Sequence, residues 1–292
     1  MNDGKERSVP AFAGGKDIAM VRGFYEAASG VLAQQRNFNV ISNNIANVTT
    51  TGYKAETLVG SSFAAHMVAR LGDGMISPRR SIGPAVFFTT NIEEYTDFAQ
   101  GSIENTGRDL DMALVGDGSS AIDPESMEEG AQPNVFFMVD SERMGEVLTR
   151  NGQFSIDAEM NLILPGVGLV LDDGGSPIAL DSSNITVDES GVIRYADGDG
   201  EEVARIGVYS VEDARALENA GQGFYRSEAS PDVAVAGSYR VAQYAIEKSN
   251  VNTAMEMSRV IAGQNLYNAC TQVVKMYDQL NEVLVTQIGR VS

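Results

Sequence analysis

Residues 21–45 read VRGFYEAASGVLAQQRNFNVISNNI, and the apolar side chains in this stretch recur at spacings of three and four or at sums of these. That period places them on one face of a helix. The run NNIANVTTTG (residues 43–52), at the end of the stretch, is of a kind that stops a helix and starts an extended segment. We therefore expect an amphipathic helix with an apolar stripe of Val21, Phe24, Ala28, Val31, Phe38 and Ile45, widened by Tyr25, Leu32 and Ile41.

A second, stronger stripe lies at the other end of the chain. Its apolar residues alternate by four and three, which is the spacing of a coiled-coil seam. Asn250 and Asn252 are the two candidates for the residue that opens this helix, with Thr253 close behind. Striped helices at both chain ends can pack antiparallel on each other or against neighbouring subunits. The seam comprises Leu266, Cys270, Val273, Tyr277, Leu280 and Leu284, with Val260, Val274 and Ile288 beside it.

The middle of the chain changes to short runs that are alternating or continuously apolar, a pattern typical of strands. Turn sequences such as Asn151-Gly152 separate these runs, and the stretch from Gly116 to Pro133 is expected to be a surface loop. Closely spaced strands without helical pattern between them indicate antiparallel pairing. The expected strands are Val135–Val139, Glu146–Thr149, Gln153–Asp157, Asn161–Leu164, Gly168–Leu171, Asn184–Val187, Val192–Tyr195 and Val203–Tyr209.

The predicted fold class is α+β, with long, coiled-coil-like N- and C-terminal helices flanking a central antiparallel all-β domain. The pattern divides the chain into five segments. They are an extension at 1–19 that we expect to be disordered, an N-terminal helix and turn at 20–52, an extended or irregular linker at 53–99, the central β domain at 100–240 with an acidic loop near 116–133, and a C-terminal helix at 241–292.

The chain of 292 residues is acidic, with a formal net charge of -19, and 43% of its residues are hydrophobic. The charge is uneven, since residues 53–240 hold 32 acidic and 12 basic residues, whereas residues 241–292 hold four of each. Phosphate backbones repel so acidic a chain, which excludes nucleic acid as a partner. A solvated acidic middle beside a neutral end fits a subunit that packs through its ends.

Nothing in the sequence indicates a membrane span or a cleavable secretory signal. No window approaches the roughly 18 uninterrupted apolar residues of a transmembrane helix. The first twenty residues include Asp3, Glu6 and Asp17 and lack an apolar core. Cys270 is the single cysteine, so one chain forms neither a disulfide nor a thiolate metal cluster. If the protein leaves the cytoplasm, another export route must carry it.

No motif indicates catalysis, a metal or a bound cofactor, so we expect a protein that is not an enzyme. His66 is the one histidine, and no nucleophile elbow lies beside it, which favours a surface or packing role. The run from Asp197 to Glu202 places Glu202 where a calcium loop needs glycine, so it is interpreted as a charged hairpin turn. Carboxylate pairs such as Asp109 and Asp111 follow from the acidic composition alone.

The two helical ends resemble the signature of a known family. MVRGFYEAASGVLAQQR (residues 20–36) and VISNNIANVTTTGYK (residues 40–54) resemble the N-terminal signature of bacterial flagellar basal-body rod and hook proteins, the axial proteins of the flagellum. QGSIENTGRDLDMA (residues 100–113) resembles the mid-chain element of that family, and residues 249–257, with Gln264 and Tyr267, resemble its C-terminal helix. The resemblance covers nearly the whole chain after Met20.

The resemblance implies a structural subunit of the flagellum basal body, exported by the flagellar type III apparatus without signal cleavage. It implies a rod subunit, with the distal rod favoured and the proximal rod possible, whose terminal assembly helices polymerise helically, enclose the export channel and transmit torque. The implied partners are copies of itself, other rod and hook axial proteins and the export apparatus, with no cofactor, no nucleic acid and no direct membrane insertion. The implied assembly interface comprises Val31, Phe38, Asn43, Asn44, Asn47, Gly52, Asn250, Asn252, Met257, Gln264, Tyr267, Val274, Tyr277 and Leu284.

The chain departs from the family pattern in three places. The aromatic pair expected soon after the mid-chain glycines is Phe136-Phe137, which indicates an insertion at about residues 119–133. Asn265 stands where the family usually has arginine, which puts the interface contact there in question. Residues 1–19 precede the start of the family pattern, so Met20 is a candidate initiator.

Two other classes of function compete with a rod subunit. An extracellular binding module or adhesin that uses the acidic β domain predicts a soluble monomer with a ligand. A hydrolase of the envelope needs a catalytic constellation, and the motifs above supply none.

Overall fold

The protein, in a computed structural model, is described over residues 14–61, 66–70, 80–85, 91–116, 134–196, 202–211, 214, 217–227, 231–234 and 239–288. It divides into two compact units. The helical unit takes in the described parts of Met1–Val40, Leu58–Glu94 and Met257–Ser292, and the β unit those of Ile41–Thr57 and Tyr95–Glu256. The expected extension lies, up to residue 13, outside the described residues.

An α-helix lies near each end of the chain, α1 at Gly14–Ala46 and α2 at Thr253–Ile288. Asn252 opens α2, because its Oδ1 accepts hydrogen bonds from the backbone N–H groups of Ala254 and Met255, both at 3.1 Å. This decides between the two candidates for the capping residue. Neither helix, over its described length, combines the extent and apolar character that a membrane crossing requires.

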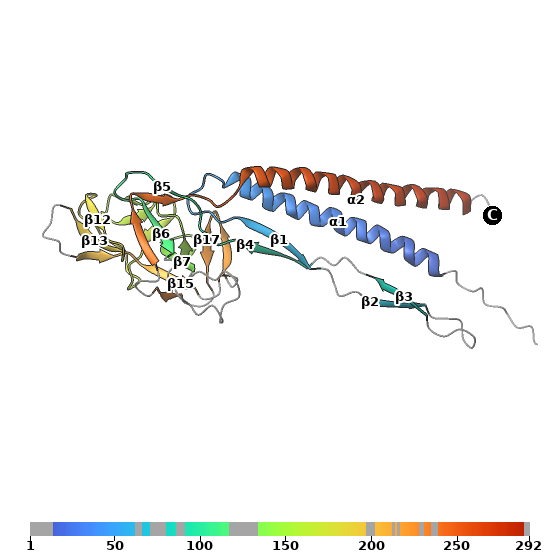
Figure 1. The fold of residues 1–292 in the computed structure, drawn as a ribbon, viewed down its shortest axis with the longest axis horizontal. Helices are drawn as coiled ribbons and strands as arrows, with labels where there is room; N and C mark the ends of the chain where they lie inside the picture. The colour runs from blue at the N-terminus through green and yellow to red at the C-terminus, as the bar shows by residue number, and fades with distance from the viewer. Residues whose placement is uncertain are drawn as a thin grey trace, which may run out of the picture. The chain divides into compact units, whose positions relative to one another are not determined.

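Within the helical unit, α1 and α2 run side by side (Figure 1). Gly263 and Tyr267 of α2 lie against Phe38 of α1, and the ring centroids of Phe38 and Tyr267 are 6.3 Å apart. Cys270, further along α2, lies against Gly30, which is earlier in α1. The order of these contacts shows that the pair is antiparallel.

The predicted fold class is wrong as formulated, because only part of the expected coiled-coil seam, at Cys270, lies against α1. Its members Leu266 and Leu280 are 51% and 52% exposed. The apolar stripe of α2 is wider than the strip that one neighbouring helix covers, so spacing alone does not decide which side is buried. Strands also occur ahead of the central domain. The structure supports an α+β chain with a helix near each end and a central multi-strand antiparallel β domain.

The strands ahead of the central domain form two small sheets. β1 (Glu56–Ser61) pairs with β4 (Asn91–Thr96), and β2 (His66–Arg70) pairs antiparallel with β3 (Arg80–Ala85). Thr57 Oγ1 of β1 donates a hydrogen bond to the carbonyl of Tyr95 in β4 at 3.5 Å.

The largest sheet of the β unit has the order β16-β17-β8-β7-β11-β10-β9, and β15 pairs with β7 and β18. Its described pairs are antiparallel. The strands are β7 (Asn134–Ser141), β8 (Gly145–Thr149), β9 (Ser155–Ile156), β10 (Leu162–Leu164), β11 (Gly168–Val170), β15 (Val208–Val211), β16 (Glu218–Gly221), β17 (Phe224–Arg226) and β18 (Asp232–Val233).

Three smaller sheets complete the described part of the β unit. They pair β12 (Ile185–Val187) with β13 (Val192–Tyr195) and β14 (Glu202–Arg205), β6 (Met112–Gly116) with β19 (Tyr239–Gln243), and β5 (Ile103–Asn105) with β20 (Ala245–Glu247). The eight predicted strands are confirmed as β7 to β15, because the last run is split by Ile206 and Gly207 into β14 and β15.

The core of the β unit forms where the apolar faces of these strands meet. Phe137 and Phe154 contact each other edge to face, with ring centroids 5.1 Å apart, and both are fully buried. A second cluster forms around Phe136 and Tyr225. Each buried ring of this kind stabilises the folded state by about 1.5–3 kcal/mol relative to exposure.

Some sequence predictions fall outside the described residues. These are the expected surface loop from Gly116 to Pro133, apart from Gly116 itself, residues 197–201 of the expected hairpin turn, and the side chain of His66.

Candidate assembly site

Asn44, in the last turn of α1, ties the end of that helix to the extended segment that follows. Its Oδ1 accepts hydrogen bonds from the backbone N–H of Glu56 at 2.9 Å and from the Tyr53 hydroxyl at 3.3 Å. Its Nδ2 donates to the carbonyl of Glu56 at 2.8 Å. The side chain is fully buried, and it replaces hydrogen bonds that the backbone cannot make where the helix stops.

The turn between Asn44 and Tyr53 depends on two further residues of the polar run. Asn47 donates through Nδ2 to the carbonyl of Asn43 at 2.9 Å and accepts from Thr50 Oγ1 at 3.1 Å. Gly52 has a φ of 68°, and a Cβ there would lie 2.4 Å from the carbonyl carbon of Arg150. Only glycine fits that close approach in that backbone conformation.

Lys54 forms a buried ion cluster with Glu247 and Arg150. Lys54 Nζ lies 2.6 Å from Glu247 Oε1 and donates to the carbonyl of Ala99 at 2.9 Å. Arg150 Nη1 lies 3.4 Å from Glu247 Oε2, and the backbone N–H of Gly101 donates to Glu247 Oε1 at 2.8 Å. The Lys54, Arg150 and Glu247 side chains are 1%, 6% and 0% exposed. One carboxylate therefore compensates two buried cations.

Burial sets the electrostatics of this cluster. Desolvation lowers the pKa of Lys54, against the charge of Glu247, which raises it. Desolvation likewise lowers the pKa of Arg150, whose guanidinium lies over the Phe136 ring, 5.3 Å from the ring centroid. Burial, followed by the charge of Glu56, raises the pKa of the Tyr53 hydroxyl. For Lys54 and Arg150, the charge of Glu247 opposes the effect of desolvation on the pKa.

Asn250 links the chain before α2 to two other segments. Its Oδ1 accepts from the backbone N–H of Ala55 at 2.7 Å. Its Nδ2 donates to the carbonyls of Asp97 and Ala99 at 2.9 and 3.1 Å. Asn44, Lys54, Arg150, Glu247 and Asn250 are hereafter the junction cluster. It joins the segment after α1, the segment 97–101 and the segment before α2.

The junction cluster holds chain segments together and offers no reactive group to solvent. Each of its side chains bonds to a backbone group or to another member of the cluster, and one buried atom, Arg150 Nε, has no hydrogen-bond partner within the described part of the chain. Across the described residues no three His, Cys, Asp or Glu side chains are placed to hold a metal ion. The arrangement is that of a structural joint.

The predicted interface residues fall into three groups. Asn44 and Gly52 are buried inside the β unit. Asn43, Asn252, Met257 and Gln264 are exposed, while the side chain of Leu284 lies outside the described residues. The half-buried members are Val31, Phe38, Asn47, Asn250, Tyr267, Val274 and Tyr277.

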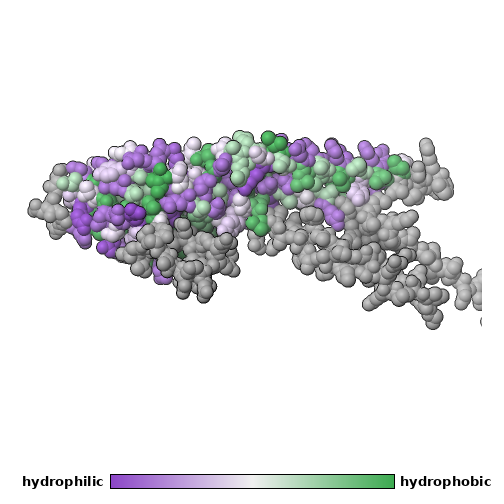
Figure 2. Space-filling model, in the orientation of Figure 1, coloured by the Kyte–Doolittle hydropathy of each residue, from purple (hydrophilic) through white to green (hydrophobic). Residues whose placement is uncertain are grey.

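A row of exposed apolar side chains lies on the helices, and the predicted interface contained only one of its members, Met257. Ile261 and Val285 of α2 are 62% and 72% exposed, and Tyr25 and Leu32 of α1 are 67% and 59% exposed. Figure 2 shows apolar side chains interspersed with polar ones along α2. Large apolar side chains exposed in this number on two helices are of the kind that a protein–protein contact covers. The further members on α2 are Met255, Met257, Leu266, Met276, Leu280 and Val283.

Sequence reasoning also missed the partners of Lys54. The quoted signature ends on Lys54, but Glu247 and Arg150 carry no local signal of a role. They lie 193 and 97 positions apart from their partners in the Lys54–Glu247 and Arg150–Glu247 pairs. Only the fold brings them together.

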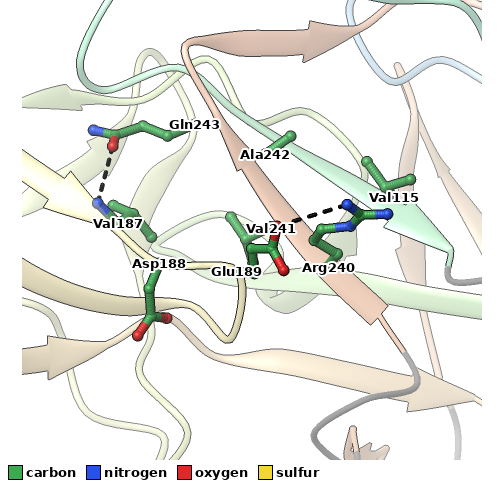
Figure 3. A pocket seen from close by; sticks show the side chains of 8 residues that line it. All are labelled: Val115, Val187, Asp188, Glu189, Arg240, Val241, Ala242 and Gln243. Atoms are coloured by element: carbon green, nitrogen blue, oxygen red, sulfur yellow. Dashed lines mark hydrogen bonds and ion pairs between the residues drawn. The ribbon is translucent and has the colours of Figure 1, made fainter.

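A separate groove of about 610 Å³ lies in the β unit between β6, β19 and the turn from β12 to β13 (Figure 3). The Gln243 amide accepts from the backbone N–H of Val187 at 2.9 Å and donates to the carbonyl of Ile185 at 2.9 Å. Arg240 and Glu189 form an exposed ion pair at 3.6 Å. These polar groups already have partners within the chain, so the groove presents no set of converging free groups for a ligand.

Comparison with known proteins matches both ends of the chain to one family. Residues 24–54 match the flagella basal body rod proteins, and residues 242–287 match the C-terminal region of the flagellar basal body rod FlgEFG proteins. The matches at both ends support the flagellar basal-body rod protein family. Lys54 closes the first matched segment and Glu247 lies in the second, so the ion pair joins the two.

The similarity to individual relatives extends over nearly the whole chain. The flagellar basal-body rod protein FlgF of Caulobacter vibrioides is 27% identical, over 94% of this chain and 100% of the relative. The flagellar hook-basal body complex protein FlhO of Bacillus subtilis is 28% identical over 93% and 100%. The flagellar basal-body rod protein FlgG of Buchnera aphidicola is 27% identical over 91% and 99%.

Proposed function

We propose that this chain is a structural subunit of the bacterial flagellum basal body that polymerises helically through its terminal helices. The observation that carries the proposal is the row of exposed apolar side chains on α1 and α2, which one chain cannot bury by itself. A repeated head-to-tail contact between copies buries such a row and generates a filament.

The junction cluster supports the same function. It ties the segment that follows α1 and the segment that precedes α2 to one part of the β unit, through the Lys54–Glu247 pair and the amides of Asn44 and Asn250. Among the described residues, the cluster uses its buried charges and amides to hold chain segments together. This favours a structural role over an enzymatic one.

The finer assignment rests on the family. The chain is a rod subunit, of the distal rod in preference to the proximal rod, which encloses the export channel and transmits torque. Its partners are copies of itself and other rod and hook axial proteins, and the flagellar export apparatus delivers it. The rod names of the relatives, FlgF and FlgG, support the rod assignment.

Electron microscopy of the purified chain at rising concentration tests the proposal. The full-length protein is compared with a chain that lacks residues 267–292, because this removes most of α2 and leaves the junction cluster intact. We expect tubes or filaments from the full-length chain only. Near-ultraviolet circular dichroism, through the tyrosines of the β unit, serves as the control for folding of the truncated chain.

Filaments from the truncated chain would contradict assembly through the helices. Monodisperse monomers from both proteins, even with preformed rod or hook fragments as nuclei, would contradict a rod subunit and favour the binding-module alternative.

A further inference from the structure

Each helix of the antiparallel pair presents a glycine to the other. A Cβ built on Gly263 of α2 would lie 3.1 and 3.4 Å from the Cε1 and Cζ atoms of Phe38, and 3.3 Å from Gln34 Oε1. A Cβ built on Gly30 of α1 would lie 3.0 Å from Cys270 Sγ. Carbon atoms in good contact lie about 3.5–4.0 Å apart, so each glycine is a notch filled by a side chain of the other helix.

We propose that Gly30 and Gly263 are positioning residues that set the register of α1 against α2. Phe38 fills the notch at Gly263, and Cys270 fills the notch at Gly30. The notches are reciprocal, one on each helix, so both are occupied only when the helices stand at one relative position.

A slip of one turn removes the fit. Neighbours on the same helix face are three or four residues apart, so a slip places Phe38 against Val260 or Tyr267. Both carry side chains where Gly263 has none. A close-packed contact cannot absorb that volume without displacing the helices, and the observed register is therefore favoured over its neighbours.

Glycine inside a helix is otherwise unfavourable, because it is less helix-forming than alanine by about 1 kcal/mol. Two glycines inside these helices therefore cost helix stability, which their packing must offset. Packing of the Phe38 ring and of the Cys270 sulfur explains their presence.

The register matters for assembly, and this step rests on the proposed function. The exposed apolar row belongs to both helices, with Leu32 on α1 and Leu280 on α2 among its members. A slip of one turn shifts one half of that row by about 5.4 Å against the other half. Equivalent contacts between copies require that every subunit has the same register.

Cys270 provides a direct test in the full-length chain. The Cβ built on Gly30 lies 4.0 Å from Cys270 Cβ, within the 3.5–4.5 Å range of disulfides. The variant Gly30→Cys is oxidised mildly and its intrachain disulfide is measured by mass spectrometry of the digested protein. Ala27→Cys and Gln34→Cys, one turn away on either side, are the matched controls. We expect Gly30→Cys to form the bond at least about tenfold faster than either control.

Filling the other notch tests the register itself. When Gly263→Ala is added to each of the three cysteine variants, the preference of Cys270 for forming a disulfide with position 30 over positions 27 and 34 should fall several-fold. Phe38→Ala should then restore it, because it removes the ring that the new methyl group meets. Loss through general destabilisation would not be rescued by a second large-to-small change.

Equal rates at positions 27, 30 and 34 would overturn the proposal, as would an unchanged preference after Gly263→Ala. Filament formation is scored separately on the reduced proteins. Selective disulfide formation in a chain that makes no filaments would leave the register inference standing and count against the proposed function alone.

Discussion

Replacement of Glu247 by glutamine is the sharpest test of the junction cluster. Glu247 is the counterion of both Lys54 and Arg150, and its side chain is fully buried. Glu247→Gln preserves the shape and one hydrogen-bond acceptor and removes the charge. Two buried cations then remain without a carboxylate, and breaking a buried pair in this way costs about 3–5 kcal/mol of folding free energy.

The expected loss is large beside the total stability of a domain, which is about 5–15 kcal/mol. Urea unfolding at pH 7, followed by near-ultraviolet circular dichroism, measures it. Because Glu247 raises the pKa of Lys54, the variant's lysine should release its proton more easily. The loss of folding free energy in the variant should therefore shrink as the pH rises towards 10.5, the ordinary pKa of lysine, since a neutral buried amine costs less than a charged one.

Glu104→Gln is the matched control. Glu104 pairs with Lys248, next to Glu247 in the sequence, but both side chains are about half exposed. Loss of this exposed ion pair should lower the free energy of unfolding by at most about 1 kcal/mol. If Glu247→Gln lies within that range at pH 7, or if Lys54→Met added to it recovers no stability, the reasoning that the cluster is a charge-compensated joint is refuted.

Three further outcomes are expected. Gly52→Ala should destabilise the β unit more than Gly107→Ala in thermal unfolding, because both have φ near 70° but only Gly52 faces backbone within 2.4 Å. Leu280→Gln should suppress filaments in electron microscopy without changing the unfolding midpoint. The control Glu282→Gln should change neither filament formation nor the midpoint. Partial burial raises the pKa of Asp188, but hydrogen bonds from Ser190, Val192 and Arg194 outweigh it and lower that pKa to about 2. Its stabilisation is therefore complete above the ordinary 3.8 and lost as pH falls towards 2, and this part of the acid unfolding profile should disappear in Asp188→Asn.

Local elements of this protein follow from the sequence because their signals are local. The helical spacing in residues 21–45 anticipated α1, and the continuous apolar run Val135–Val139 anticipated β7. Asn252 was one of two candidates for the N-cap of α2, and the structure selected it. Each of these depends on residues within a few positions of one another.

The buried side of α2 does not follow from spacing. Its apolar residues occupy a wider strip than one helix can cover, so Leu266 and Leu280 satisfy the periodicity as well as Gly263 and Tyr267 do. The contact with Phe38 and Gly30 decides between them, because a ring and a sulfur fit where α2 or α1 has no Cβ.

The joint between the chain ends is likewise a product of tertiary structure. The sequence alone determined that the ends are helical, that the middle is acidic and strand-forming, and that a specific signature runs to Lys54. It contained no local sign that Lys54 meets Glu247, or that Glu247 meets Arg150, because a buried charge is defined by what surrounds it. Folding brings residues 193 and 97 positions apart together in a buried site, and only when buried do the two cations need the carboxylate to compensate their charges.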